Sequence, residues 1–395
     1  MTVEHNKKTV ADVPVDGRRV LVRVDFNVPI DKAGDITDDR RIREALPTIK
    51  YLIDHGAKVI LVSHLGRPGG QPNPKYSLRP IAEHLQKLLG QPVTFVPETV
   101  GPVAEAAVQK LLPGQVALLE NVRFYPGEEK NDPAFAEQLA KLADLYVNDA
   151  FGTAHRAHAS TVGVTRFLPA VSGFLMEKEL QALGNALDSP RRPLVAIVGG
   201  AKISSKISVL QHLLPRVDCL LIGGGMANTF LRAQGHEIGR SLVEVDQIPV
   251  ARQIMAAAGP KLVLPIDVVV ASEPQPAALP IVTLIDQVAA NQMILDVGPK
   301  TVDRFAQVVS TAGTVIWNGP LGMAEVPPFA EGTLGVARAV AQSSATSIVG
   351  GGDLVSVLEQ LGLADRMSHV STGGGASLEF LEGKILPGVA ALEDK

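Results

Sequence analysis

Cysteine is almost absent from this chain, since Cys219 is the only one among 395 residues. A single thiol cannot form an internal disulfide, which excludes a scaffold held together by cystines. Residues 217–222 around it are mainly apolar, a setting that disfavours the thiolate. We therefore expect Cys219 to pack as a small buried side chain and not to act as a nucleophile.

Long apolar runs and a dominant charge are lacking as well. No stretch approaches the roughly 20 apolar residues of a membrane span, and residues 1–8 contain no apolar signal core. We expect a cytoplasmic protein with no membrane partner. The formal net charge of -4 argues against a general binder of nucleic acid, so any anion site must be built locally.

Several sequence signatures are missing. No repeat of fixed short period and no low-complexity tract occurs, so a solenoid is not expected. No G-x-x-x-x-G-K-[ST] and no G-x-G-x-x-G opens a helix after a strand, which disfavours a P-loop enzyme and a dinucleotide-binding fold. A nicotinamide-dependent dehydrogenase would suit the alternating pattern described next, but its phosphate fingerprint is absent.

What the chain does contain is an alternation of short β-branched runs with longer amphipathic stretches, typical of βα units on a mostly parallel sheet. The expected strands are residues 20–24, 58–62, 93–96, 116–119 and 145–147 in the first half, and 194–198, 220–222, 262–264, 314–317 and 347–349 in the second. At this length, with 46% apolar residues, we predict two similar three-layer α/β domains. They would comprise residues 1–172 and 189–385, joined by a connector helix over 173–188, which is rich in helix formers.

Polar and basic side chains follow the expected strands of the first half. They are Asp25 and Asn27, His64 and Arg67, Arg123, and then Asn148, Asp149, His155, Arg156 and His158. Ligands of open α/β sheets bind beyond the carboxyl ends of the strands, so these side chains should converge on one crevice. Arginine forks match phosphate and carboxylate, which predicts an anion pocket. His155 and His158 could instead ligate a metal, but no Cys or Glu partner lies at a recognised spacing.

Glycines dominate the strand ends of the second half. After the apolar strand 194–198 comes Gly199-Gly200-Ala201-Lys202, and Lys206 follows at i, i+4 from Lys202. If a helix starts here, both lysines share a face and its free N–H groups face an anion. Glycine loops also occur at 223–225, 298, 350–352 and 373–375, and such loops admit a base or a phosphate close to the backbone. This half should therefore hold a nucleotide, with Asp353 either capping a helix or holding Mg²⁺.

A set of ordered motifs carries a family resemblance. They lie at residues 23–29 (RVDFNVP), 41–47, 63–68 (SHLGRP), 120–124 (ENVRF), 148–156 (NDAFGTAHR), 173–180, 199–202 (GGAK), 317–320 (WNGP) and 371–377 (STGGGAS). Through them the chain resembles phosphoglycerate kinase over essentially its whole length. The resemblance implies reversible phosphoryl transfer between 1,3-bisphosphoglycerate and MgADP, giving 3-phosphoglycerate and MgATP, in glycolysis, gluconeogenesis or carbon fixation. It also implies a monomer in which residues 386–395 return to the first domain and a hinged cleft closes between the domains.

The resemblance further implies roles for individual residues. The glycerate substrate would be bound by Asp25, Phe26, Asn27, Arg41, His64, Leu65, Gly66, Arg67, Arg123 and Arg156, with Arg41 also near the transferring group. The nucleotide would be bound by Lys202, Lys206, Gly223, Gly224, Gly298, Asn318, Glu325, Gly351, Gly352, Asp353, Leu354, Gly373 and Gly374. Arg41, Lys202 and Lys206 would be catalytic, and Asp353 would hold Mg²⁺ together with ADP or ATP.

Two positions depart from the family pattern. Leu354 stands where threonine is usual, and Ala324 stands where an aromatic residue usually precedes Glu325. We expect the missing hydroxyl to weaken the grip on MgADP and Leu354→Thr to change nucleotide affinity. A catalytically silent nucleotide- or metabolite-binding protein on the same scaffold is the alternative function, and the preference for adenine or guanine stays open.

Overall fold

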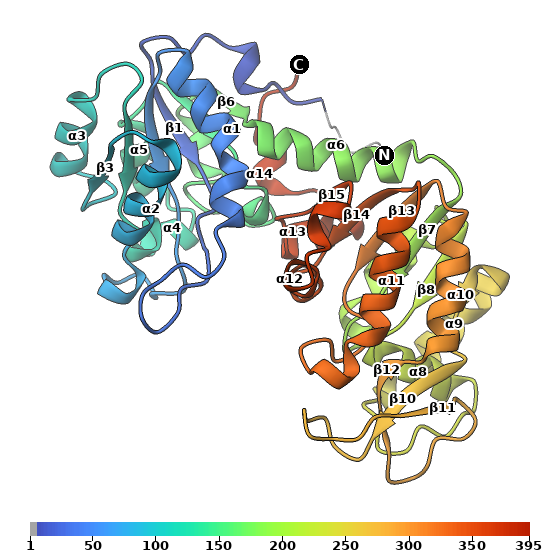
Figure 1. Ribbon diagram of the computed structural model, residues 1–395. Helices are drawn as coiled ribbons and strands as arrows, with labels where there is room; N and C mark the ends of the chain where they lie inside the picture. The colour runs from blue at the N-terminus through green and yellow to red at the C-terminus, as the bar shows by residue number, and fades with distance from the viewer. Residues whose placement is uncertain (1–5) are drawn as a thin grey trace. The chain divides into compact units, whose positions relative to one another are not determined.

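The computed structural model describes residues 6–395, which divide into two compact units (Figure 1). The first unit contains the chain up to Gln181 together with Ile385–Lys395, and the second contains Ala182–Lys384. Helix α6, Phe174–Asp188, begins in the first unit and ends in the second. Within residues 6–395, no helix is both long enough and apolar enough to span a membrane.

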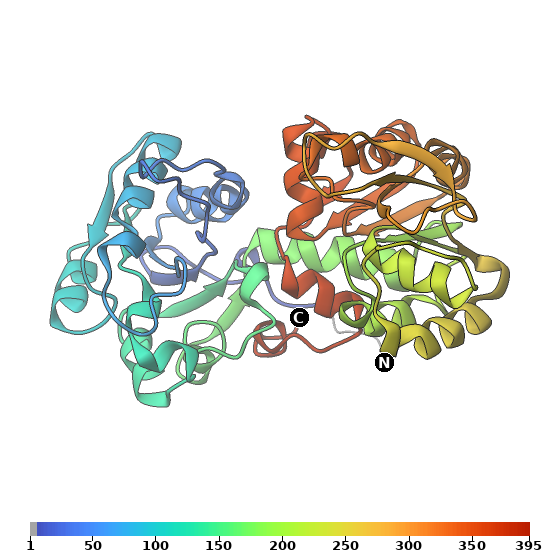
Figure 2. The same cartoon turned by 90° about the horizontal axis from the view of Figure 1, so that it is seen from below.

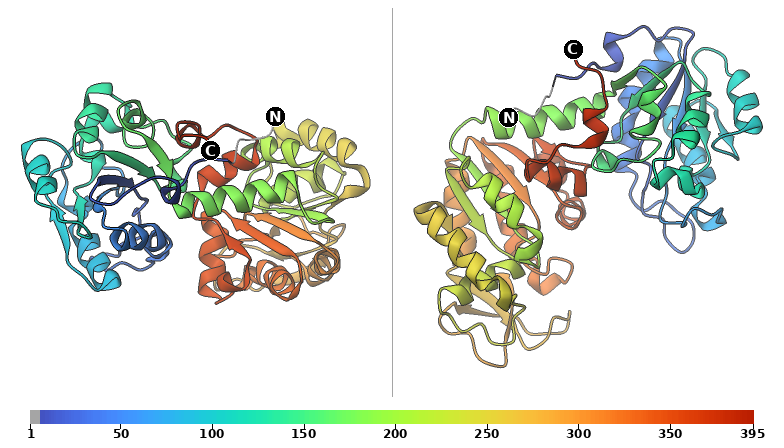
Figure 3. Two further views of the ribbon diagram at one scale, coloured as in Figure 1. Left: turned by 90° about the horizontal axis from the view of Figure 1, so that it is seen from above. Right: turned by 180° about the vertical axis from the view of Figure 1, so that it is seen from behind.

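The first unit is built on a six-stranded parallel sheet in the order β3-β4-β2-β1-β5-β6 (Figure 3). Its strands are β1 Arg19–Arg23, β2 Lys58–Val62, β3 Val93–Val96, β4 Val116–Leu119, β5 Leu145–Asn148 and β6 Ala170–Ser172. Its helices are α1 Arg40–Asp54, α2 Arg79–Leu89, α3 Pro102–Gln109, α4 Pro126–Glu129, α5 Pro133–Ala140 and α14 Pro387–Ala390. The central strands are apolar on both faces because helices cover the sheet on either side.

Helix α2 illustrates how the pattern produces the element. Ile81, Ala82 and Leu85 recur at helical spacing and are buried against the sheet. Gly90 ends the helix in the left-handed region, at φ 67°, where a side chain would be strained. The apolar stripe and the glycine stop together determine where the helix lies and where it ends.

The second unit repeats the plan with a parallel sheet in the order β15-β14-β13-β7-β8-β9 and helices on both faces (Figure 2). Its strands are β7 Leu194–Val198, β8 Cys219–Ile222, β9 Leu262–Val263, β13 Thr314–Asn318, β14 Thr346–Gly350 and β15 His369–Val370. Its helices are α7 Ile207–Leu213, α8 Gly225–Ala233, α9 Ile248–Ala258, α10 Pro299–Ser310, α11 Glu331–Gln342, α12 Gly352–Gln360 and α13 Gly375–Leu381. The expected class, two α/β domains with parallel sheets, is confirmed.

A small antiparallel sheet in the second unit was not predicted. Its order is β11-β10-β12, with β10 at Asp267–Ala271, β11 at Ile281–Leu284 and β12 at Met293–Val297. β11 is a largely exposed edge strand, whereas β10 is buried. Cys219 is half-buried at the start of β8, and burial raises the pKa of its thiol.

The C-terminal segment lies beside the N-terminal segment within the first unit (Figure 3). The Lys8 N–H donates to Glu393 O at 2.9 Å, and Lys7 Nζ lies 2.6 Å from Asp394 Oδ1. Farther along, the Gly388 N–H donates to Ala154 O at 2.8 Å. Both ends of the described chain therefore stabilise the same unit.

In each unit the direction of the connections reverses at a central strand. β1 pairs with β2 on one side and with β5 on the other, and β7 likewise pairs with β8 and β13. Such a switch point opens a crevice at the carboxyl ends of the strands. The loops that follow β1, β2 and β5, and those that follow β7, β8, β13 and β14, are therefore placed to form sites.

Candidate active site

The loop after β1 is held to helix α1 by an arginine. Arg41 Nη1 donates to Asn27 O at 2.9 Å and lies 3.4 Å from Asp25 Oδ2. Asn27 Oδ1 accepts the Gly66 N–H at 2.9 Å, which ties this loop to the loop after β2. Asp25, Asn27, Arg41 and Gly66 are thus brought together as the sequence predicted, and the Arg41 side chain stays partly exposed.

His64, in the loop after β2, is buried and contacts a buried arginine. Arg23 Nη2 lies 3.1 Å from His64 Nδ1. Because guanidinium only donates, Nδ1 must accept, and the ring proton is left on Nε2. Burial first, and then Arg23, Arg123 and Arg41, hold the pKa of His64 well below its usual range. His64 is therefore a neutral hydrogen-bond donor near neutral pH.

The other predicted substrate residues are placed unequally. Arg123 is buried and donates from Nη1 to Gly66 O at 3.1 Å. Arg156 is exposed, and its charge helps to lower the pKa of Arg123. Arg67 is exposed and makes no hydrogen bond or ion pair with any described residue. Phe26 and Leu65 are buried, so they shape this region from beneath.

Asn148 and Asp149 do not join this basic cluster, contrary to the expectation. Asp149 Oδ1 accepts the N–H groups of Leu175 at 2.9 Å and Met176 at 3.3 Å, which places it at the start of helix α6. Full burial raises the pKa of Asp149 to about 7. Asn148 Oδ1 accepts the Ala150 N–H at 3.0 Å. Both side chains stabilise backbone turns.

Beneath His64 lies a polar network that sequence reasoning missed. Arg23 Nε donates to Ser160 Oγ at 2.8 Å, and Ser160 Oγ and N donate to Glu128 at 2.5 and 2.7 Å. Arg23, Ser160 and Glu128 are all 0% exposed, so the arginine has a complete set of buried partners. Burial raises the pKa of Glu128, and Arg23 opposes that rise. The only signal in the sequence was an arginine at the end of an otherwise apolar strand.

The net character of this cluster is cationic. Arg23, Arg41, Arg123 and Arg156 gather around two neutral histidines, since burial and the neighbouring arginines lower the pKa of His158 to about 4. Arg123 Nε and His158 Nδ1 are buried and have no hydrogen-bond partner. Such unsatisfied groups around clustered positive charge are suited to a small polyanion.

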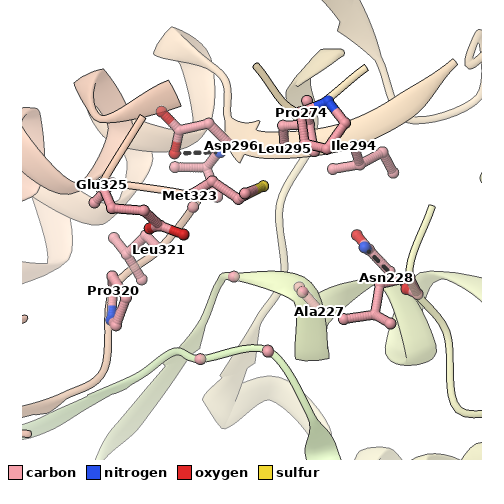
Figure 4. A pocket seen from close by; sticks show the side chains of 18 of the residues that line it. Ala227, Asn228, Pro274, Ile294, Leu295, Asp296, Pro320, Leu321, Met323 and Glu325 are labelled. Carbon is pink, nitrogen blue, oxygen red and sulfur yellow. Dashed lines mark hydrogen bonds between the residues drawn. The ribbon is translucent and has the colours of Figure 1, made fainter. Parts of the chain in front are cut away.

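The second unit contains a cavity of about 550 Å³ (Figure 4). Its wall includes Gly200 and Ala201 after β7, Gly224 and Gly225 at the start of α8, and residues 320–325 after β13. Apolar side chains line another part of it, among them Leu231, Leu242 and Ile294. A volume of this size and a wall with few polar groups are typical of small-molecule sites.

Around the glycine loop beside the cavity, a lysine and an asparagine are paired. Lys206 Nζ donates to Asn318 Oδ1, and a Cβ on Gly200 would lie 3.5 Å from Lys206 Cε. Because an ammonium only donates, the atom facing it must be the oxygen, and Asn318 Nδ2 is left as a buried donor without a partner. Gly351 is adjacent, since a Cβ on it would lie 3.5 Å from Asn318 Nδ2. These groups form a donor-rich corner suited to phosphate.

The expected helical face of two lysines is wrong. Lys202 is in extended conformation, a 3-10 turn follows over Ile203–Ser205, and α7 begins only at Ile207. Lys202 is exposed, whereas Lys206 is partly buried and burial lowers its pKa. The two side chains therefore belong to a loop and do not share a helix surface.

Asp353 and Leu354, neighbours in the first turn of α12, differ in environment. Asp353 is exposed, lines the cavity, does not cap the helix, and makes no hydrogen bond or ion pair among the described residues. Leu354 is 0% exposed and packs in the hydrophobic core with Trp317 and Leu358. The Leu354 side chain therefore points away from the cavity, and the missing hydroxyl gives no reason for a weaker grip on a nucleotide.

The remaining predicted nucleotide residues divide into two groups. Glu325 and Gly224 line the cavity, as does Ala324. Gly223, Gly298, Gly352, Gly373 and Gly374 are not among the residues of its wall. Gly298 leaves no room for a side chain, because a Cβ there would lie 2.3 Å from the Asp267 carboxyl carbon. Gly374, at φ 49°, precedes the first turn of α13.

Two buried polar side chains in the cavity wall were not predicted. Asp296 accepts the Gly332 and Val297 N–H groups at 2.7 and 2.8 Å, and burial raises its pKa to about 8. Asn228 lies on α8 and donates from Nδ2 to Leu242 O at 3.1 Å. A polar residue inside the apolar helix 225–233 was the only sequence signal for Asn228.

Comparisons with known proteins agree with this architecture. The family model "Phosphoglycerate kinase" matches residues 10–384. The chain is 60% identical to phosphoglycerate kinase of Chloroflexus aurantiacus over 98% of this chain and 99% of that protein, and 61% identical to that of Herpetosiphon aurantiacus over 99% and 100%. The solved structure of phosphoglycerate kinase from Coxiella burnetii superposes with a TM-score of 0.87 at 45% identity, covering 98% of each chain.

Proposed function

The chain belongs to the phosphoglycerate kinase family and is a phosphotransferase, and from this premise we propose how its own residues divide the reaction between the two units. The reaction is the reversible transfer of a phosphoryl group between 1,3-bisphosphoglycerate and ADP, giving 3-phosphoglycerate and ATP. The basic cluster of the first unit would bind the glycerate substrate, and the cavity of the second unit would bind the nucleotide.

One observation carries the assignment of the substrate pocket. Buried arginines surround a neutral His64 and leave buried donors without protein partners. A trianionic phosphoglycerate supplies the missing acceptors. His64 would donate from Nε2, and Arg123 would contribute its unsatisfied Nε–H. Arg41 is partly exposed at the rim, so it is the arginine best placed to face the transferring group.

The nucleotide phosphates would lie at the donor-rich corner of the second unit. Lys206 supplies a positive charge, Asn318 Nδ2 a free buried donor, and Gly351 a position next to the start of helix α12. Phosphoryl transfer depends mainly on positioning and on stabilising charge, so no side-chain nucleophile is needed.

Asp353 suits a magnesium ion held jointly with the nucleotide. Within residues 6–395, no group of three or more His, Cys, Asp or Glu is arranged to bind a metal. Mg²⁺ commonly binds one or two carboxylates together with substrate phosphates and water, and Asp353 is a carboxylate without a partner in the cavity wall. Bound there, the ion would neutralise phosphate charge.

The two sites belong to different units, so we propose that transfer follows a hinge movement that brings them together. Closure would also exclude water, which otherwise hydrolyses the acyl phosphate. Family membership supports further proposals: a cytoplasmic monomer that acts on small molecules, with no nucleic-acid partner.

The test is ATP-dependent turnover of 3-phosphoglycerate, coupled to reduction of the acyl phosphate, in the wild type, Arg41→Ala and Arg43→Ala. Arg43 lies on the same helix but pairs with Asp39 at 2.8 Å, away from the basic cluster, so it is the matched control. We expect Arg41→Ala to lower kcat at least about 100-fold and Arg43→Ala to leave it unchanged. Nucleotide binding without turnover in the wild type would instead support the silent-binder function.

A further inference from the structure

Asn228 carries a buried acceptor without a partner. It is the fourth residue of helix α8, is 1% exposed and lies in the wall of the cavity. Its Nδ2 donates to Leu242 O at 3.1 Å, whereas its Oδ1 has no hydrogen-bond partner. Buried polar atoms are nearly always paired in folded proteins, so an exception inside a binding cavity points to a ligand.

The orientation of this amide is determined by its neighbour. The carbonyl oxygen of Leu242 can only accept, so the atom facing it must be the NH₂ group. The free atom is therefore the oxygen, which can only accept. In Figure 4 the Asn228 side chain extends from α8 toward the side of the cavity where Ile294 lies.

The cavity has a polar end and an apolar end. At the polar end, Gly200 approaches Lys206, and its carbonyl accepts the Met226 N–H at 3.0 Å. Asn228 lies farther along α8, beside Leu242, and the Ile294 N–H donates to Ser241 Oγ at 2.8 Å in the same wall. A nucleotide with its phosphates at the polar end directs its base toward Asn228, Leu242 and Ile294.

We propose that Asn228 Oδ1 accepts a hydrogen bond from the exocyclic amino group of adenine and so selects adenine nucleotides. The inference rests on the proposed nucleotide site and assigns its base preference. Adenine carries a donor at position 6, whereas guanine and hypoxanthine carry a carbonyl there. A carbonyl facing Asn228 Oδ1 would place two acceptors together and leave both unpaired.

The test compares ADP with purine riboside diphosphate, which differs only by lacking the 6-amino group. Dissociation constants are measured by calorimetry for the wild type, Asn228→Leu and Thr229→Val. Thr229 is the matched control, because it is buried on the same helix but its hydroxyl accepts the Glu244 N–H at 3.2 Å, and it is not part of the cavity wall. A purely structural role of Asn228 would weaken both ligands equally.

We expect the wild type to bind ADP about tenfold more tightly than purine riboside diphosphate, since one hydrogen bond is gained and a buried acceptor is satisfied. Asn228→Leu should reduce that ratio to about one, and Thr229→Val should preserve it. A wild-type ratio near one overturns the inference even if Asn228→Leu does not fold, and so does an unchanged ratio in that variant. Turnover of ATP with 3-phosphoglycerate, assayed in parallel, tests the proposed function separately, and failure to bind either nucleotide overturns both.

Discussion

Replacing Arg23 by methionine tests the buried network beneath His64. Arg23 donates to Ser160 Oγ, Val24 O and His64 Nδ1, and its charge faces Glu128, which is also fully buried. Methionine occupies a similar length but leaves Glu128 without its cation. Removing one partner of a buried ion pair typically costs about 3–5 kcal/mol. In a domain of about 200 residues, this lowers the melting temperature by about 10 °C.

The assay is urea unfolding of the wild type, Arg23→Met and the double variant Arg23→Met/Glu128→Gln. Neutral glutamine removes the uncompensated charge, so the double variant should be more stable than Arg23→Met by about 1–2 kcal/mol. Loss of the Arg23 charge should also raise the pKa of His64, although burial, its larger cause, remains. NMR titration of the imidazole measures that rise. The reasoning is refuted if Arg23→Met costs less than about 1 kcal/mol or if adding Glu128→Gln destabilises it further.

Two further variants test individual side chains. The pKa of Asp149 is about 7 in the folded protein against 3.8 as its model value, so the folded state holds the proton more tightly, and stability contributed by that proton is lost as pH rises from about 4 to 7. Unfolding of Asp149→Asn should therefore show stability gained relative to the wild type across that range, at most about 1.4 kcal/mol per pH unit, and parallel pH curves would contradict it. Leu354→Thr should destabilise the protein by about 2–4 kcal/mol, because it removes buried methyl groups and places a hydroxyl in the core, and should leave MgADP affinity unchanged. Calorimetry and thermal unfolding distinguish this from a direct phosphate contact, in which affinity would rise.

Periodicity predicted the parallel strands well because strands buried on both faces are continuous apolar runs. It did not reveal β6 and β15, which are short edge strands, or the exposed β11, whose flanking prolines and lack of burial hide the alternation. Tertiary pairing stabilises these elements, and local sequence gives little sign of it.

For the site, strand ends placed Asp25, Asn27, His64 and Gly224 near the crevices. The lysine spacing was misleading, because i, i+4 neighbours meet only inside a continuous α-helix, and a 3-10 turn intervenes before Ile207. Glu128 and Asn228 could not be identified from sequence, since their importance comes from burial beside partners far away in the chain.

The return of Ile385–Lys395 to the first unit has a consequence for protein synthesis. The second unit is one uninterrupted segment, Ala182–Lys384, and it can complete its contacts as soon as it leaves the ribosome. The first unit begins earlier but needs Gly388 against Ala154 and Glu393 against Lys8, which are translated last. The half of the polypeptide that is made first is therefore the half that finishes folding last, and truncation by a premature stop near the end would damage the domain encoded at the start.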